Sequence, residues 1–203
     1  ALSTPTTGFV DPRSHPAPSP TAAQTLRLAA GAQTDVGAVR SENQDAYGML
    51  PTVALGTGDV AGRVVPQPAV FAVADGMGGH EAGAEASEVA VRAMLGAFGP
   101  GFRSQPDRRA LMTAAITAAN DAVWARANAG GHRRQMGTTC TLLLLADGQA
   151  YLGHVGASRA YRIRGSEVEQ LTPDHTLGEV TRNNPSLAEI TKARSHHLPR
   201  AVS

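Results

Sequence analysis

A carboxylate at the end of an apolar run is the most informative feature of this 203-residue sequence. The segment Val70–His80 reads VFAVADGMGGH, so a strand of small apolar residues leads Asp75 into a glycine-rich bend. A strand end holds the carboxylate still, and Gly76 has no side chain, so its backbone carbonyl is free to approach the same ion. The segment therefore indicates a site for a hard divalent cation, with an ordinary strand-to-helix turn as the alternative.

A second polar cluster comes earlier, where residues 37–45 read GAVRSENQD. In an extended, irregular segment Arg40 and Asp45 line a common cleft. The planar Arg40 guanidinium then binds a phosphate, and Asp45 orders metal-bound water. The alternative is a solvated turn that carries charges at its tip.

Other catalytic motifs do not fit the sequence. Glu81 stands where a dinucleotide-binding fingerprint requires glycine, and a Gly-Lys-Ser/Thr phosphate loop does not occur. The sequence also lacks a His-Glu-x-x-His zinc motif and a Gly-x-Ser-x-Gly nucleophile elbow. His80 follows the glycine bend and is a weak candidate for the cleft, whereas His154 lies in a strand pattern and is expected to be a satisfied core residue.

The composition predicts one soluble domain, with 42% hydrophobic residues and a formal charge of +1. Near-neutral charge and only 4% aromatic residues argue against nucleic acid as the main partner. A single cysteine, Cys140, fits a reducing compartment, and no apolar run is long enough to span a bilayer. We therefore expect a cytoplasmic location and no membrane segment.

The first 26 residues are rich in Pro, Ser and Thr and are expected to form a linker or a disordered tail. The remainder, residues 27–203, alternates strand and helix patterns. In the second helix Met112, Ile116, Ala119 and Val123 recur at helical spacing and predict a packing face. The predicted strands are Thr34–Val39, Ala69–Ala74 and an antiparallel meander of Thr138–Leu145, Gln149–Val155 and Ala160–Arg164, and the predicted helices are Gly83–Phe98 and Arg108–Asn128.

Three further motifs follow the two polar clusters along the chain: GTT at 137–139, VGASRAY at 155–161 and LTPDHT at 171–176. The ordered series resembles the metal-dependent Ser/Thr protein phosphatases of the PPM family, type 2C, and fits the bacterial branch best. The resemblance implies an α+β fold with two antiparallel β-sheets packed as a sandwich and flanked by helices. It also implies hydrolysis of phosphomonoesters by metal-activated water.

The same resemblance assigns roles to individual residues. Asp75 bridges two Mn²⁺ or Mg²⁺ ions, the Gly76 carbonyl holds the second ion, Asp45 acts largely through water, and Arg40 binds the substrate phosphate. The implied substrates are Ser/Thr-phosphorylated proteins, and a cognate Ser/Thr kinase is an implied partner.

The sequence departs from the family pattern in two ways. Ala157 stands where the family carries aspartate, so the third-metal site is expected to be impaired. The chain also stops at Ser203, before the family's later Ser-Asp-Gly and Asp-Asn segments, so we expect residues 27–203 to be the N-terminal and central part of the domain, without its C-terminal strands. A non-catalytic pseudophosphatase, or a regulatory module that binds phosphoproteins, is therefore the alternative function.

Overall fold

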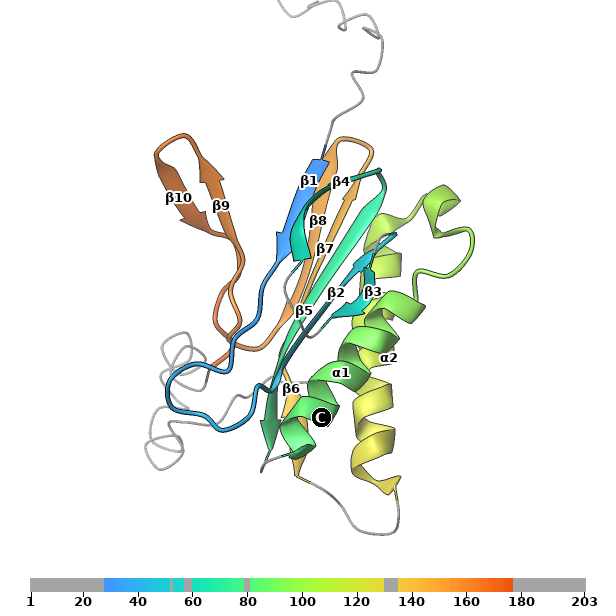
Figure 1. Cartoon of the computed structure of the whole chain (residues 1–203). Helices are drawn as coiled ribbons and strands as arrows, with labels where there is room; N and C mark the ends of the chain where they lie inside the picture. Colours follow the sequence, from blue (N-terminus) through green and yellow to red (C-terminus); the bar gives the residue numbers. More distant parts are fainter. Residues whose placement is uncertain (1–27, 52, 57–59, 79–80, 130–134, 177–203) are drawn as a thin grey trace, which may run out of the picture.

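The computed structural model describes residues 28–51, 53–56, 60–78, 81–129 and 135–176 (Figure 1). The segment predicted to be a linker, residues 1–26, lies outside these ranges, as does His80. In chain order the elements are β1 (Leu28–Ala32), β2 (Asp45–Leu50), β3 (Val53–Gly56), β4 (Val60–Val65), β5 (Ala69–Gly78), α1 (Glu81–Gly96), the 3-10 turn η1 (Phe102–Ser104), α2 (Arg108–Ala127), β6 (Met136–Thr138), β7 (Cys140–Ala146), β8 (Gln149–Val155), β9 (Tyr161–Arg164) and β10 (Glu167–Gln170).

The main sheet is antiparallel and has the strand order β3-β2-β5-β7-β8, with β6 paired to the end of β5. Its central strands are rich in apolar residues, and burial alternates along them. In β7 every second residue from Cys140 to Ala146 is buried. Burial raises the pKa of the Cys140 thiol to about 12, which is the behaviour of an inert core cysteine.

Both helices cover one face of this sheet, on the right in Figure 1. Helix α2 begins at a cap in which the Asp107 carboxylate accepts a hydrogen bond from the Ala110 N–H at 2.9 Å. Its predicted packing face is confirmed, because three of its residues are buried and Ile116 packs against the same core. The core also holds small residues that let α1 lie close to the sheet: Ala46, Ala72 and Ala74 from strands, with Ala82, Ala86 and Ala90 from α1.

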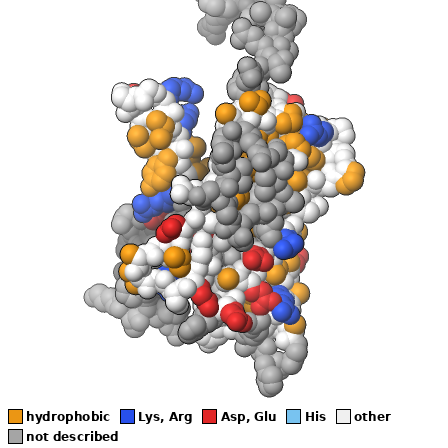
Figure 2. Space-filling view, viewed as in Figure 1, with side chains coloured by type: hydrophobic (Ala, Val, Ile, Leu, Met, Phe, Trp, Pro, Cys, Tyr) orange, Lys and Arg blue, Asp and Glu red, His pale blue; other side chains and the backbone are white. Residues whose placement is uncertain are grey.

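The other face of the main sheet carries side chains that alternate with the core residues. Val73 on this face is 48% exposed. Two small antiparallel sheets, β1–β4 and β9–β10, lie on this side in Figure 1. Apolar side chains are visible on the β9–β10 hairpin in Figure 2, where Ile163 is 71% and Val168 66% exposed. The predicted α+β class with antiparallel strands is confirmed.

Two sequence predictions about strands are wrong. Residues Thr34–Val39 contain no strand, because the Asp35 carboxylate accepts a hydrogen bond from the Gly37 N–H and Gly37 turns the chain with a φ of +74°. The predicted meander ends at β8, because Gly156, with a φ of +112°, turns the chain away from the ladder. Strand β9 pairs with β10 instead.

Among the described residues, no helix has the length and apolar character needed to cross a membrane.

Candidate metal centre

Asp45 and Asp75 lie directly opposite each other in the β2–β5 ladder, where Asp45 is the first residue of β2 and β5 continues past Asp75 to Gly78. Directly opposed residues share one face of a sheet. That face is the one without helices, because Ala46 and Ala74, the neighbours of the two aspartates, point into the helical core. The predicted strand end at Ala74 is wrong, because Gly76 and its neighbours pair with β6 and β5 continues to Gly78. The opposed positions in the ladder, not a bend, bring the two carboxylates together.

The electrostatics of the pair favour an added positive charge. Burial raises the pKa of the Asp75 carboxyl above its usual value, and repulsion from Asp45 and a hydrogen bond with the Asp45 carboxyl raise it further. The Arg40 guanidinium opposes this shift in the pKa of Asp75. Arg40 therefore lies within electrostatic reach of Asp75. Asp75 also keeps a solvent-exposed side, through which an ion can enter.

The loop that presents Arg40 is held by side-chain hydrogen bonds at both ends. Asn43 Nδ2 donates to Thr34 Oγ1 at 2.7 Å, and the Asp45 N–H donates to Asn43 Oδ1 at 3.0 Å. Arg40 itself is exposed. The guanidinium is thus available to a ligand in solution.

Gly76 must be glycine because helix α1 begins against it. A β-carbon at this position would lie 1.9 Å from the Gly83 carbonyl oxygen and 2.8 Å from the Gln44 carbonyl oxygen. Gly83 is similarly constrained, because its own β-carbon would meet the Gln44 side-chain amide at 2.7 Å. These contacts fix the angle at which the chain leaves β5 and enters α1.

The direction of the Gly76 carbonyl follows from the strand ladder. Gly76 lies opposite Thr138, and the Thr139 N–H donates to the Asp75 carbonyl at 2.9 Å. This pattern makes Gly76 and Thr138 a non-hydrogen-bonded pair, whose N–H and C=O groups point away from each other. The Gly76 N–H accordingly donates to the Gln44 carbonyl at 3.0 Å on the β2 side. Its carbonyl faces the same side, toward the strand that carries Asp45.

The sequence reasoning assigned no role to three hydroxyl groups that surround Asp75. Thr138 Oγ1 donates to the Asp75 carbonyl at 2.9 Å, and Thr139 Oγ1 accepts from the Asp75 N–H at 3.0 Å. Ser158 Oγ lies 2.6 Å from Thr139 Oγ1. The GTT and GASR motifs were visible in the sequence, but nothing in either motif indicated that both threonines bond Asp75 or that Ser158 contacts Thr139.

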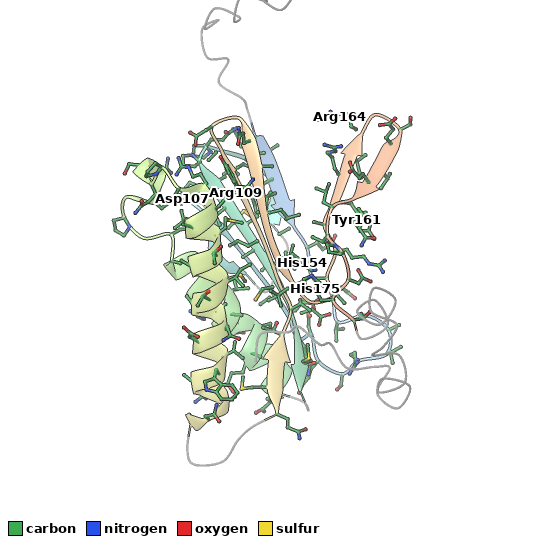
Figure 3. The ribbon with its side chains drawn as sticks, turned by 180° about the vertical axis from the view of Figure 1, so that it is seen from behind. Asp107, Arg109, His154, Tyr161, Arg164 and His175 are labelled. Atoms are coloured by element: carbon green, nitrogen blue, oxygen red, sulfur yellow. The ribbon has the colours of Figure 1, made fainter. Side chains whose placement is uncertain are left out.

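His154 has hydrogen-bond partners, as predicted, but it is half-buried on the sheet face without helices and is not part of the core. Its Nδ1 lies 3.0 Å from Thr141 Oγ1, and its Nε2 lies 3.0 Å from the Gly156 carbonyl. Because a carbonyl only accepts, Nε2 carries the proton. His154 lies beside His175 in Figure 3, with ring centroids 5.1 Å apart, and the His175 Nδ1 accepts from the Gly156 N–H at 3.3 Å.

The segment after Gly156 is tied to the LTPDHT motif. Arg159 makes two hydrogen bonds to the Asp174 carboxylate, at 2.8 and 2.6 Å, and this ion pair lowers the pKa of Asp174. Ala157 sits between Gly156 and Ser158 and is half-buried. Among the described residues, no three or more His, Cys, Asp or Glu side chains converge as a metal site. The described donors are thus the two aspartates and backbone oxygens.

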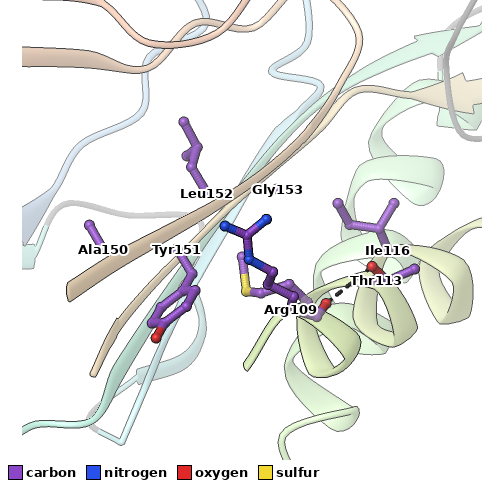
Figure 4. A pocket seen from close by; sticks show the side chains of 8 residues that line it. Arg109, Thr113, Ile116, Ala150, Tyr151, Leu152 and Gly153 are labelled. Carbon is purple, nitrogen blue, oxygen red and sulfur yellow. Dashed lines mark hydrogen bonds between the residues drawn. The ribbon is translucent and has the colours of Figure 1, made fainter. Parts of the chain in front are cut away.

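A separate cavity of about 350 Å³ lies between α2 and β8 (Figure 4). Met112 and Ile116 line it next to Gly153, and Arg109 and Tyr151 also line it. Neither Asp45 nor Asp75 lines it. Acidic side chains gather instead at the lower part of the face in Figure 2, where Figure 1 shows β5 meeting α1.

Comparison with known proteins identifies the family. The family model described as protein phosphatase 2C matches residues 41–196. The chain belongs to this family. Among curated relatives, the serine/threonine protein phosphatase PstP of Mycobacterium tuberculosis is 33% identical over 177 residues, which are 86% of this chain and 30% of that protein. Protein phosphatase PhpP of Streptococcus pneumoniae is 36% identical over 148 residues, 71% of this chain and 54% of that protein.

Solved structures agree with this family. The catalytic domain of PstP in complex with two manganese ions is 30% identical, with a TM-score of 0.59 over 87% of this chain and 66% of that one. Stp1 from Staphylococcus aureus is 25% identical, with a TM-score of 0.67 over 88% of this chain and 66% of that one. These matches confirm the predicted sandwich fold and the bacterial branch. The chain spans less than a third of the length of PstP.

Proposed function

We propose that this phosphatase 2C family chain carries the metal-binding half of a protein serine/threonine phosphatase, which hydrolyses phosphomonoesters with activated water. The observation that carries the proposal is the opposition of Asp45 and Asp75 across two strands, with the charge of Arg40 within reach. The names of the relatives support the same activity. Ala157 is the one described residue that favours the non-catalytic alternative, and it affects only the third-metal position.

The donor set fits a hard divalent cation. Two carboxylates on one face of the sheet, together with a neighbouring backbone carbonyl that points toward β2, are oxygen ligands of the kind that Mn²⁺ and Mg²⁺ prefer. Asp75 would bridge two ions, and the Gly76 carbonyl would hold the second. A bound cation pair supplies charge neutralisation at the phosphoryl group and lowers the pKa of water.

The protein's own groups then position the substrate. Arg40, exposed on its loop, binds the phosphate oxygens with its planar fork. Asp45 accepts a hydrogen bond from the attacking water. This bond orients the water so that a lone pair on the water oxygen points at phosphorus. Ala157 offers no oxygen at the third-metal position, so we propose that a third ion binds weakly or not at all.

The proposed substrates are proteins that carry phosphoserine or phosphothreonine. Such groups arise by phosphoryl transfer to a hydroxyl, so a Ser/Thr kinase must supply them, and we propose that it acts in the same compartment, the cytoplasm. The reduced, buried Cys140 is compatible with that location.

The test uses phosphate release from a phosphoserine peptide by the full-length protein that contains this chain. We expect turnover with Mn²⁺ and none after chelation. Arg40→Ala should raise KM about tenfold or more, because a charge-assisted contact to phosphate is lost. Arg92→Ala, which removes another exposed arginine, one that pairs with Glu88 on its own helix, is the matched control and should leave KM unchanged. Turnover that persists in chelator would overturn the proposal.

A further inference from the structure

The ladder between β5 and the β6–β7 segment is irregular at the residue that carries the metal-binding carboxylate. The flanking pairs place Thr139 directly opposite Asp75. In a regular hydrogen-bonded pair of this kind, the two residues exchange two N–H···O=C bonds. Here the Thr139 N–H does donate to the Asp75 carbonyl, but the Asp75 N–H donates to the Thr139 side-chain hydroxyl instead of its carbonyl. A side chain has thus replaced one backbone acceptor.

The replacing hydroxyl is itself held in place. Thr139 is only 2% exposed, and its β-branched side chain has few accessible rotamers. Thr139 Oγ1 already accepts from Asp75, and it lies 2.6 Å from Ser158 Oγ, to which its proton can be donated. The hydroxyl of Ser158 thereby fixes the rotamer of Thr139. Gly156 makes the close approach possible, because a β-carbon there would lie 2.6 Å from Thr139 Cγ2.

The geometry assigns Thr139, supported by Ser158, as the positioning residue that sets the direction of the Asp75 carboxylate and so the affinity of the site for a divalent cation. This inference rests on the proposed function. Asp75 is held through its N–H by Thr139 Oγ1 and through its carbonyl by the Thr139 N–H and by Thr138 Oγ1. With both flanking peptide groups fixed, rotation about the side-chain bonds is the only freedom left to the carboxylate.

Loss of the Thr139 hydroxyl has a specific consequence. Valine has the same shape but no acceptor, so the Asp75 N–H loses its partner and the strand end must shift to find another. Hard cations require oxygen ligands at nearly fixed distances, so a small shift weakens their binding. Serine keeps the acceptor and should keep the affinity.

The experiment measures Mn²⁺ binding by calorimetric titration of the full-length protein, with thermal unfolding recorded in parallel. Thr139→Val should weaken Mn²⁺ binding about tenfold, which corresponds to ~1.4 kcal/mol, and Thr139→Ser should restore most of it. Ser158→Ala should give a smaller loss, because the Thr139 rotamer is freed but its hydroxyl remains.

Thr172→Val is the matched control. Thr172 is also 2% exposed, and its Oγ1 accepts from a backbone N–H, that of Ala160, at 2.9 Å, but it does not contact Asp75. Thr172→Val should lower the unfolding temperature as Thr139→Val does, but it should not change the affinity for Mn²⁺. Equal losses of affinity in the two valine variants, or unchanged affinity in Thr139→Val, would overturn the positioning role. Should Thr139→Val not fold, unchanged affinity in Ser158→Ala would overturn it instead. A wild-type protein that binds no Mn²⁺ would instead refute the proposed function.

Discussion

Asp45 and Asp75 lie directly opposite each other on neighbouring antiparallel strands. Like charges in directly opposed positions destabilise a sheet. The two ionised carboxylates therefore destabilise the β2–β5 pairing unless a cation binds to them. Burial raises the pKa of Asp75, and the opposed Asp45 carboxylate raises it further.

Removal of the charge at Asp75 should abolish metal-dependent activity. In Asp75→Asn the neutral amide cannot bridge two cations, and we expect phosphopeptide hydrolysis to fall at least ~100-fold, which is about 2.7 kcal/mol in the barrier. The fold should survive, because the amide has nearly the same size. Phosphate release with circular dichroism on the same sample checks both expectations, and activity within about tenfold of wild type would contradict the bridging role.

In the metal-free protein, Asp75→Asn should raise the stability of the fold, although it abolishes activity. The pKa of Asp75 is raised in the folded state above its ordinary value of 3.8, so the stability that its protonated form contributes is complete below pH 3.8 and is lost as pH rises through the folded-state value. In chelator at pH 7, Asp75→Asn should therefore unfold at a higher temperature than wild type, and the difference should shrink toward pH 4. Mn²⁺ should stabilise wild type only. A wild type more stable than the variant in chelator at pH 7 would contradict this.

The glycine at the strand–helix junction should tolerate no side chain. Gly76→Ala places a methyl group 1.9 Å from the Gly83 carbonyl, and we expect a loss of ~3 kcal/mol or more in the free energy of unfolding. Gly96→Ala is the control, because no atom lies within 4 Å of the added carbon at the end of α1. That change should be neutral or stabilising by up to ~1 kcal/mol. Urea unfolding of both variants measures the contrast.

The alanine at the third-metal position should limit activity. Ala157→Asp restores a carboxylate beside Ser158, and in the full-length protein we expect faster phosphate release at saturating Mn²⁺. Ala157→Asn, with the same size and no charge, should not accelerate it. If both variants raise the rate equally, a charge at this position is not the reason.

The sequence predicted the elements whose local patterns agree with their packing. The bounds of β8, Gln149–Val155, were predicted as the structure has them, because Asp147 and Gly148 form the turn that precedes it and both have positive φ. Residues Thr34–Val39 were misjudged, because their apolar character is real but an aspartate side chain bonds the backbone locally. Short-range hydrogen bonds of this kind compete with strand pairing, and a pattern of hydrophobicity does not reveal them.

The candidate site was also predictable only in part. Asp75 and Gly76 were found because an apolar strand and glycines mark them in the sequence itself. Their proximity to Arg40 was inferred from the motif order, since the positions are separated along the chain by β2, β3 and β4. At Thr139 a hydroxyl replaces a backbone acceptor at the point between β6 and β7 where the ladder is irregular. No spacing of residue types encodes that irregularity.

Both carboxylates occupy one end of the main sheet, whereas Leu50, Ala69 and the Asp147–Gly148 turn lie at the opposite end. The β2–β5 connection, which holds β3 and β4, and the β7–β8 turn therefore join strands far from the chemistry. Connections of this kind accept insertions more readily than the elements they join. Length changes there would leave the ion-binding end of the sheet intact. New recognition surfaces can therefore be added at the far end, by natural insertion or by engineering, without changes to the residues that bind the ions.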